Sequence, residues 1–264
     1  MLKCKEKTFT LFGRIYFRRE NMRTSNPMLK KDTFRKEGVS TSAMTVGGAV
    51  AKTFIMLILL LGTSVYSYMQ MMQNKMQMPV LFGALIIATI IAFVAIFVPR
   101  ISPITAPIYA AVEGIVLGSI SAIYTMKFGD YIILHAVLLT ISILLAMLVL
   151  YATRVVKVTD KFRTGVMAAT FGIAIMYLTV FVLQLFGVPV PFLHQGGTIG
   201  IIVSAVVIVV AALNLMLDFD FIEGGARGGA PKYMEWYGAM GLMMTLVWLY
   251  LEILRFVSYF VKND

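Results

Sequence analysis

Cysteine, histidine and charged residues are all scarce in this chain of 264 residues. The single cysteine, Cys4, excludes an intrachain disulfide and argues against zinc or redox sites built from cysteine. The two histidines, His135 and His194, lack a second ligand at metal-binding spacing, so we expect no zinc centre. Only 14% of the residues are charged and 59% are hydrophobic, which is more apolar surface than a soluble globule can cover. The composition therefore indicates a membrane protein.

The signatures of catalysis are missing as well. The glycine-rich stretch E-G-G-A-R-G-G-A-P at 223–231 lacks the Lys-Ser/Thr of a phosphate-binding loop and follows no predicted strand, so we interpret it as a flexible loop. No nucleophile elbow, no Ser-His-Asp order and no G-x-G-D run of an intramembrane protease occurs. We therefore expect no enzyme and no cofactor.

Acidic residues are few, 13 against 23 lysines and arginines, which leaves a formal net charge of +10. Eleven of the 23 basic residues precede residue 40. Nucleic-acid binding is one reading of such a tail, but membrane topology and attraction to anionic headgroups explain it with fewer assumptions. We expect two parts, a basic cytoplasmic tail over residues 1–43 and a transmembrane domain over 44–264. A more ordinary start at Met22 leads to the hypothesis that residues 1–21 are an upstream extension.

The rest of the chain is dominated by apolar runs long enough to cross a bilayer. Gly114 and Gly118 form a small-xxx-small pair in the third run, which predicts close packing against a neighbouring helix. Aromatic residues at 233, 236 and 237 are expected in the headgroup belt just before the last run. The predicted spans cover residues 46–71, 79–98, 102–124, 131–153, 165–186, 198–222 and 239–260.

Seven spans put the N-terminus on one side of the membrane together with the links after spans two, four and six. That side carries 18 lysines and arginines, against three on the other side. Cytoplasmic loops carry the excess of basic residues in membrane proteins. We therefore expect a cytoplasmic N-terminus and an external C-terminus.

Acids inside the apolar runs are the candidates for function, since intramembrane ionisable residues mark ion paths by default. Asp218 and Glu252 are the favoured pair, and Asn214 lies one turn before Asp218. Asp220 is interpreted as an interfacial residue at the end of its helix. Glu113 is either a neutral acid hydrogen-bonded to a neighbouring helix or part of a pore.

Several motifs resemble the Bax inhibitor-1 family of seven-helix membrane proteins. They are L-M-L-D-F-D-F-I at 215–222, L-Y-L-E-I-L-R at 249–255 and E-G-I-V-L-G at 113–118. The S-N-P at 25–27 and M-E-W-Y-G at 234–238 resemble a bacterial subgroup of that family. The resemblance implies an all-α seven-helix bundle with the last helix in its centre, in a bacterial inner membrane.

The resemblance also implies a pH-sensing acidic pair that gates a calcium leak. By motif position, Asp218 falls on the family's first acid and Glu252 on its second, which is usually aspartate. Some relatives carry an arginine in span two that pairs with these acids. Span two has none here, so the cation partner would be Lys52, Arg255 or none.

We expect a proton-regulated passive leak for cations, most of all Ca²⁺. A proton shared by Asp218 and Glu252 would tie spans six and seven together, and ionisation of both would separate them by repulsion. The ionised pair would offer hard oxygen ligands suited to Ca²⁺. The two acids meet only if span six extends further or the last helix starts earlier than predicted. The alternative is a membrane interaction protein that modulates a membrane protease or a stress response, without transport.

Overall fold

The computed structural model describes residues 43–74, 78–187 and 197–261, so nearly all of the predicted basic tail lies outside the described residues. Over these ranges the chain is all-α, as expected, with seven helices long and apolar enough to cross a membrane. A short 3-10 helix precedes the third of them. The elements are α3 (Val46–Met72), α4 (Met78–Phe97), η1 (Pro99–Ile101), α5 (Ser102–Phe128), α6 (Tyr131–Ala152), α7 (Asp160–Leu185), α8 (Thr198–Arg227) and α9 (Met234–Val261).

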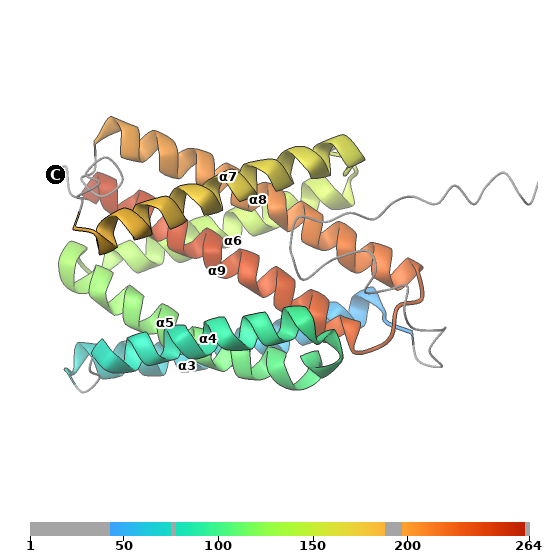
Figure 1. Cartoon of the computed structure of the whole chain (residues 1–264), viewed down its shortest axis with the longest axis horizontal. Helices are drawn as coiled ribbons and strands as arrows, with labels where there is room; N and C mark the ends of the chain where they lie inside the picture. Colours follow the sequence, from blue (N-terminus) through green and yellow to red (C-terminus); the bar gives the residue numbers. More distant parts are fainter. Residues whose placement is uncertain (1–42, 75–77, 188–196, 262–264) are drawn as a thin grey trace, which may run out of the picture.

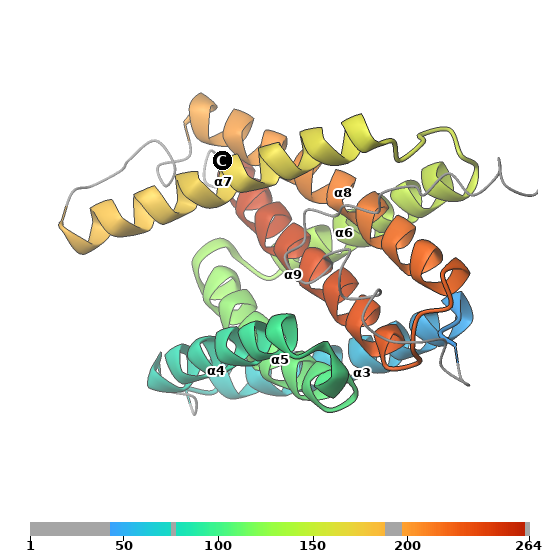
Figure 2. The same cartoon turned by 45° about the vertical axis from the view of Figure 1, so that its right-hand side comes forward.

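The last helix, α9, occupies the centre of the bundle. It runs diagonally between a group formed by α3, α4 and α5 and a group formed by α6, α7 and α8 (Figures 1 and 2). It contacts α3 and α5 on one side and α6 and α8 on the other. Of its most apolar stretch 61% is buried, against 11% for α7, which lies at the periphery. The expected central position of the last helix is therefore confirmed.

Glycines let α3 and α5 approach closely, as the small-xxx-small pair predicts. Gly114 faces the backbone carbonyl of Leu60, and Gly118 faces that of Ser64, with no room for a Cβ atom at either position. Next to Gly118, the hydroxyl groups of Ser67 and Ser119 form a hydrogen bond of 2.7 Å between the same helices. Small residues at an interface allow this backbone approach in membranes, where lipid removes the hydrophobic driving force between helices.

The link between the last two helices is shorter than predicted. The expected flexible loop over 223–231 is wrong in its first half, because α8 continues to Arg227. Likewise α9 begins at Met234, and Tyr237 is fully buried against Phe221 with 6.4 Å between the ring centroids. The interfacial position expected for Tyr237 is therefore also wrong. An acid in the first turn, Glu235, favours a helix start at this point through the helix dipole.

The start of α7 also differs from prediction. Thr159 caps the helix by accepting a hydrogen bond from the backbone N–H of Phe162 (3.2 Å), and Asp160 occupies its first turn. Side-chain caps and first-turn acids stabilise helix N-termini, so α7 begins at Asp160 rather than at the predicted Gly165.

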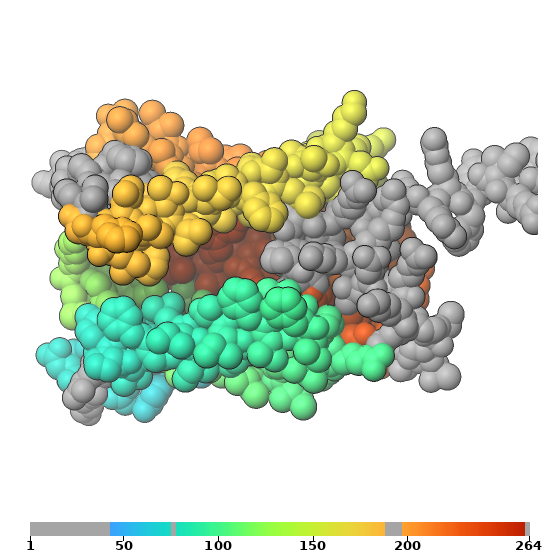
Figure 3. Space-filling model, viewed as in Figure 1, coloured from blue at the N-terminus to red at the C-terminus, as the bar shows by residue number. Residues whose placement is uncertain are grey.

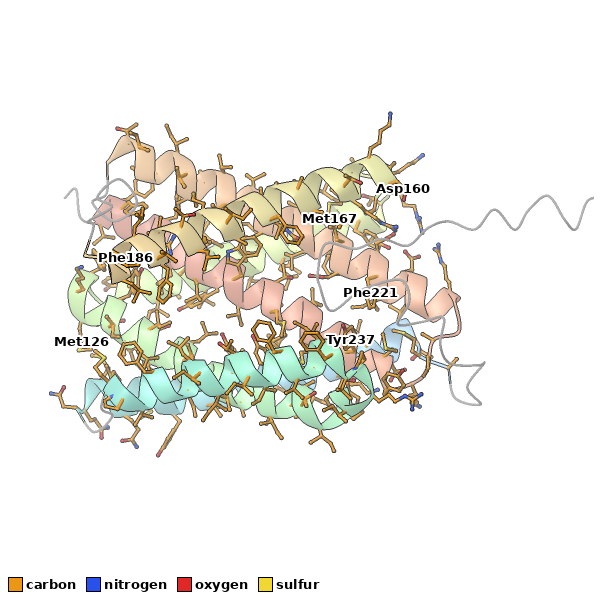
Figure 4. All side chains as sticks on the ribbon, viewed as in Figure 1. Met126, Asp160, Met167, Phe186, Phe221 and Tyr237 are labelled. Carbon is orange, nitrogen blue, oxygen red and sulfur yellow. The ribbon has the colours of Figure 1, made fainter. Side chains whose placement is uncertain are left out.

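The two ends of the bundle differ in charge. One end, where α3, α5, α7 and α9 begin, carries every described lysine and arginine except Lys127 and Arg255; we call it the basic end. In Figure 4 the label of Asp160 marks the basic end, and those of Met126 and Phe186 mark the opposite end. Between the ends the outer surface is apolar, with exposed side chains such as Phe93 and Phe171. Figure 3 shows α9 at the bottom of the gap between α7 and α4 on this face.

Candidate functional site

Glu252 lies on the central helix with only 2% of its surface exposed. The hydroxyl group of Tyr177 on α7 donates a hydrogen bond of 2.6 Å to Glu252 Oε1. Arg255, one turn further along α9, places Nη1 3.4 Å from the same oxygen and donates a hydrogen bond of 2.7 Å to the Tyr177 hydroxyl. The second carboxylate oxygen, Oε2, is buried and accepts no hydrogen bond from any described residue.

These contacts offset only part of the free-energy cost of burying the Glu252 carboxylate. A buried acid in a membrane span costs several kcal/mol unless it is paired, and a buried acceptor left without a donor adds about 1–3 kcal/mol. Charge-assisted hydrogen bonds to an ionised carboxylate are roughly twice as strong as neutral ones. The tie between α7 and α9 therefore depends on the charge of Glu252.

Asp218 on α8 is equally buried, with 2% exposure, but the structure does not bring it to Glu252. The Ser204 hydroxyl group of α8 lies 3.5 Å from the backbone oxygen of Glu252, which fixes the depth of Glu252 along α8. Fourteen residues separate Ser204 from Asp218 on this continuous helix, or about 21 Å at 1.5 Å per residue. The sequence left open whether the two acids meet, and this geometry places them apart.

The antiparallel packing of α8 and α9 explains this separation. The helices are joined by the short link 228–233, and Ile222 packs against Gly238 near it. Glu252 lies fourteen residues beyond Gly238, and Asp218 lies four residues before Ile222 on the same side of this contact. The second reference point therefore separates the two acids by ten residues, or about 15 Å along the helix. A shared proton between the acids and a Ca²⁺ site formed by both are therefore excluded by distance. Among the described residues, no group of three His, Cys, Asp or Glu could hold a metal ion.

Polar contacts connect α7 to the bundle at three depths. Arg163 pairs with Asp220 at the basic end, and Asn214 Nδ2 donates a hydrogen bond of 2.8 Å to the Thr170 hydroxyl in the middle. The Tyr177 contact with Glu252 is the third. The α7 residues at 163, 170 and 177 are spaced by seven, which places them on one face of the helix. The ion pair of Asp220 with Arg163 was not predicted, and the interfacial position of Asp220 stays a prediction.

Glu113 lies on α5, on the opposite side of α9 from α8 (Figures 1 and 2), and is 8% exposed. Hydrogen bonds from Ser102 to the Tyr233 carbonyl (2.9 Å) and between Ser121 and Tyr250 (2.7 Å) show that α5 and α9 run parallel. Glu113 is therefore at the depth of residue 243 of α9, nearer to the depth of Asp218 than to that of Glu252. The two interpretations of Glu113, as a hydrogen-bonded neutral acid or as part of a pore, both stay predictions.

A comparison with protein families tests the family resemblance that the sequence motifs indicate. The family model described as Bax inhibitor 1 like matches residues 26–262. The chain belongs to the Bax inhibitor 1 like family. The matched region includes all seven helices and the acids at 113, 218 and 252. A comparison with curated proteins gives no significant match.

This Bax inhibitor 1 like protein has a second buried acid–base site that sequence reasoning missed. Glu235, in the first turn of α9, is 2% exposed in its side chain and forms an ion pair with Lys52 of α3. It also accepts hydrogen bonds from the backbone N–H (2.9 Å) and the hydroxyl group (3.1 Å) of Thr45. Gly48 lies directly against its carboxylate, and the Lys52 ammonium lies 5.6 Å from the centre of the Trp236 ring. Lys52 is the one basic residue of α3. A lone basic residue in a membrane span needs a partner, so its presence could have predicted an acidic residue nearby.

Proposed function

We propose that this protein is a passive cation leak, regulated by protons, in which α7 is the moving element and Glu252 its sensor. The observation that carries the proposal is the buried carboxylate of Glu252, which holds α7 through Tyr177. Ca²⁺ is the cation we propose, on the basis of the family relationship. The proposal includes no enzymatic step and no cofactor.

The closed state is the one with ionised Glu252. Its negative charge attracts Arg255 and strengthens the hydrogen bond from Tyr177, so α7 is held against α9. When the pH falls, the carboxylate takes up a proton, loses its charge and binds both partners less tightly. Since α7 is the least buried of the seven described spans, weakening this contact is expected to release it most easily.

Release of α7 would uncover the polar groups that it now covers on α8 and α9. These are Glu252 at one depth and Asn214 at another, with Asp218 one turn from Asn214. A cation entering between α7 and α8 would therefore meet carboxyl groups at two depths, about 15–21 Å apart along the helix. We propose that Asp218 carries the negative charge on this path, because Glu252 is protonated when the path is open.

Calcium flux into liposomes that contain only this chain tests the gate. We expect wild-type flux to rise as the pH falls from about 8 to 5, because a neutral carboxyl group binds its ion-pair and hydrogen-bond partners less tightly than a carboxylate does. Glu252→Gln removes the charge at every pH, so its flux at pH 8 should equal the wild-type flux at pH 5 and vary little with pH. Tyr177→Phe should raise the flux at pH 8 by roughly five-fold, since one interhelical hydrogen bond is worth about 1 kcal/mol in membranes.

The matched control is Tyr66→Phe, which removes a hydroxyl group from an exposed tyrosine on α3 and should leave the flux unchanged. A wild-type pH profile in Glu252→Gln would contradict the role of Glu252. Absence of flux from the wild-type chain at every pH would instead favour the second reading, a membrane interaction protein that acts through partners.

For orientation, we propose that the basic end faces the cytoplasm of a bacterial inner membrane, with the C-terminus outside. The support is the concentration of lysine and arginine at one end of the bundle. A cysteine introduced at Lys157, in the link between α6 and α7, should react with a membrane-impermeant thiol reagent only after the cells are opened. Labelling of intact cells at this position would contradict the orientation.

A further inference from the structure

A cavity lies between the last turns of α5 and α9, at the end opposite the basic end. Its volume is about 240 Å³, many times the roughly 15 Å³ that the centre of one water molecule needs. Lys127 and Arg255 line it together with the hydroxyl-bearing side chains of Tyr124, Ser258 and Tyr259. The cavity therefore has room for a group much larger than water. Its lining combines two basic side chains with three hydroxyl groups, of which that of Ser258 already donates to the Arg255 carbonyl (2.6 Å).

The distribution of charge sets this cavity apart from the rest of the bundle. Lys127 and Arg255 are the two lysines or arginines that the described part of the chain carries away from the basic end, and both line the cavity. No acid lines it. The nearest described acids are Glu252, on the inner side of Arg255, and Asp130, exposed on the link after α5. This convergence of scarce cations predicts an anionic ligand.

The guanidinium group of Arg255 can serve two partners at once. Its Nη1 atom is engaged with Tyr177 and Glu252, whereas an arginine has five N–H donors in a planar fork. The side chain is 33% exposed, so part of the fork is accessible. Lys127 is exposed and lies 5.4 Å from the ring centre of Phe128, which also lines the cavity.

The lining is amphipathic as well as basic. Aromatic side chains, Tyr124, Phe128 and Tyr259, border the two cations at the end of two helices long enough to span a membrane, where we expect the lipid headgroups. Basic pockets between transmembrane helices bind phospholipid headgroups by pairing with the phosphate. A soluble anion would contact only the two basic side chains, while a lipid would contact the basic side chains and the aromatic ones.

We propose that this cavity binds the headgroup of an anionic phospholipid from the leaflet opposite the basic end. The phosphate lies between Lys127 and Arg255, and the hydroxyl groups of Ser258 and Tyr259 face the polar part of the headgroup. The proposal concerns binding alone and does not depend on the proposed leak.

Native mass spectrometry of the full chain in neutral detergent measures this binding directly. In titrations, phosphatidylglycerol should bind at least ten-fold more tightly than zwitterionic phosphatidylcholine. Lys127→Gln should weaken phosphatidylglycerol binding by roughly ten-fold, the effect of losing one charge-assisted contact. Because Lys127 is exposed, the variant is expected to fold, and unchanged thermal stability without lipid would check this.

Lys157→Gln is the matched control, since it removes an exposed lysine at the basic end. Equal loss of binding in both variants, or equal binding of the two lipids, would overturn the proposal. Glycerol phosphate provides the free form of the headgroup. If it displaces phosphatidylglycerol at equal concentration, the site recognises a soluble phosphate and the lipid assignment is wrong.

Discussion

Replacing Glu235 with glutamine should lower the melting temperature of the purified protein by roughly 10 °C or more. The variant leaves the ammonium group of Lys52 unpaired at a site where its side chain is only 15% exposed. Removing one partner of a buried ion pair costs about 3–5 kcal/mol, because the remaining charge stays buried. In a domain of this size, 1 kcal/mol changes the melting temperature by about 2–4 °C. Thermal unfolding in detergent, followed by circular dichroism, measures the effect.

Two further variants test whether the buried charge is the cause. Adding Lys52→Met to Glu235→Gln removes the unpaired ammonium and keeps an acceptor for Thr45, so most of the stability should return. Glu223→Gln removes a more exposed acid that pairs with Arg154 and Arg227, and it should change the melting temperature by no more than about 2 °C. If the double variant is as unstable as the single one, the ion pair is not the source of the stability.

Gly118→Ala should also destabilise the bundle, although it adds a single methyl group. An ideal Cβ atom at this position would lie 2.1 Å from the backbone oxygen of Ser64, and backbone atoms of α3 cannot yield as a side chain can. Helix α3 would have to move away, which would stretch the Ser67–Ser119 hydrogen bond. Overpacking of this kind typically costs about 1–3 kcal/mol. We expect the melting temperature to fall by roughly 5–10 °C.

Gly62→Ala is the control for helix propensity. It lies on α3 itself, and nothing is within 4 Å of its expected Cβ atom. Since alanine is the better helix former, this variant should be neutral or slightly stabilising. A Gly118→Ala variant as stable as Gly62→Ala would show that α3 and α5 can separate without cost, contrary to the close packing described above.

Much of the fold follows from the sequence, because bilayer thickness fixes the length of apolar runs. The seven spans and the glycine contacts on α5 were predicted on this basis. Helix ends were predicted less well where the end depends on a distant partner. The last helix begins at Met234 rather than near residue 239, and Glu235 is stabilised there by Lys52, 183 residues earlier in the chain. A local sequence pattern around residue 235 cannot indicate a partner this far away in the chain.

The sequence predicted single residues of the candidate site but not how these residues lie relative to one another. The burial of Asp218 and Glu252 follows from their positions in apolar runs. Their separation depends on how α8 and α9 lie against each other, which the motifs do not encode. Tyr177 and Arg163 were not predicted as partners, since a tyrosine in a span or an arginine in a basic link has many ordinary explanations.

The central position of α9 has a consequence for how the protein is made. The helix that fills the core is the last of the seven described spans in chain order, so the other six are synthesised before the interior of the bundle can form. During that interval Glu113 and Asp218 have no α9 to cover them, and Lys52 has no Glu235. The intermediate would resemble an unfinished ring of helices with polar groups that no helix yet covers. Insertion of α9 would then complete the core and form the Lys52–Glu235 ion pair between α3 and α9 in a single step.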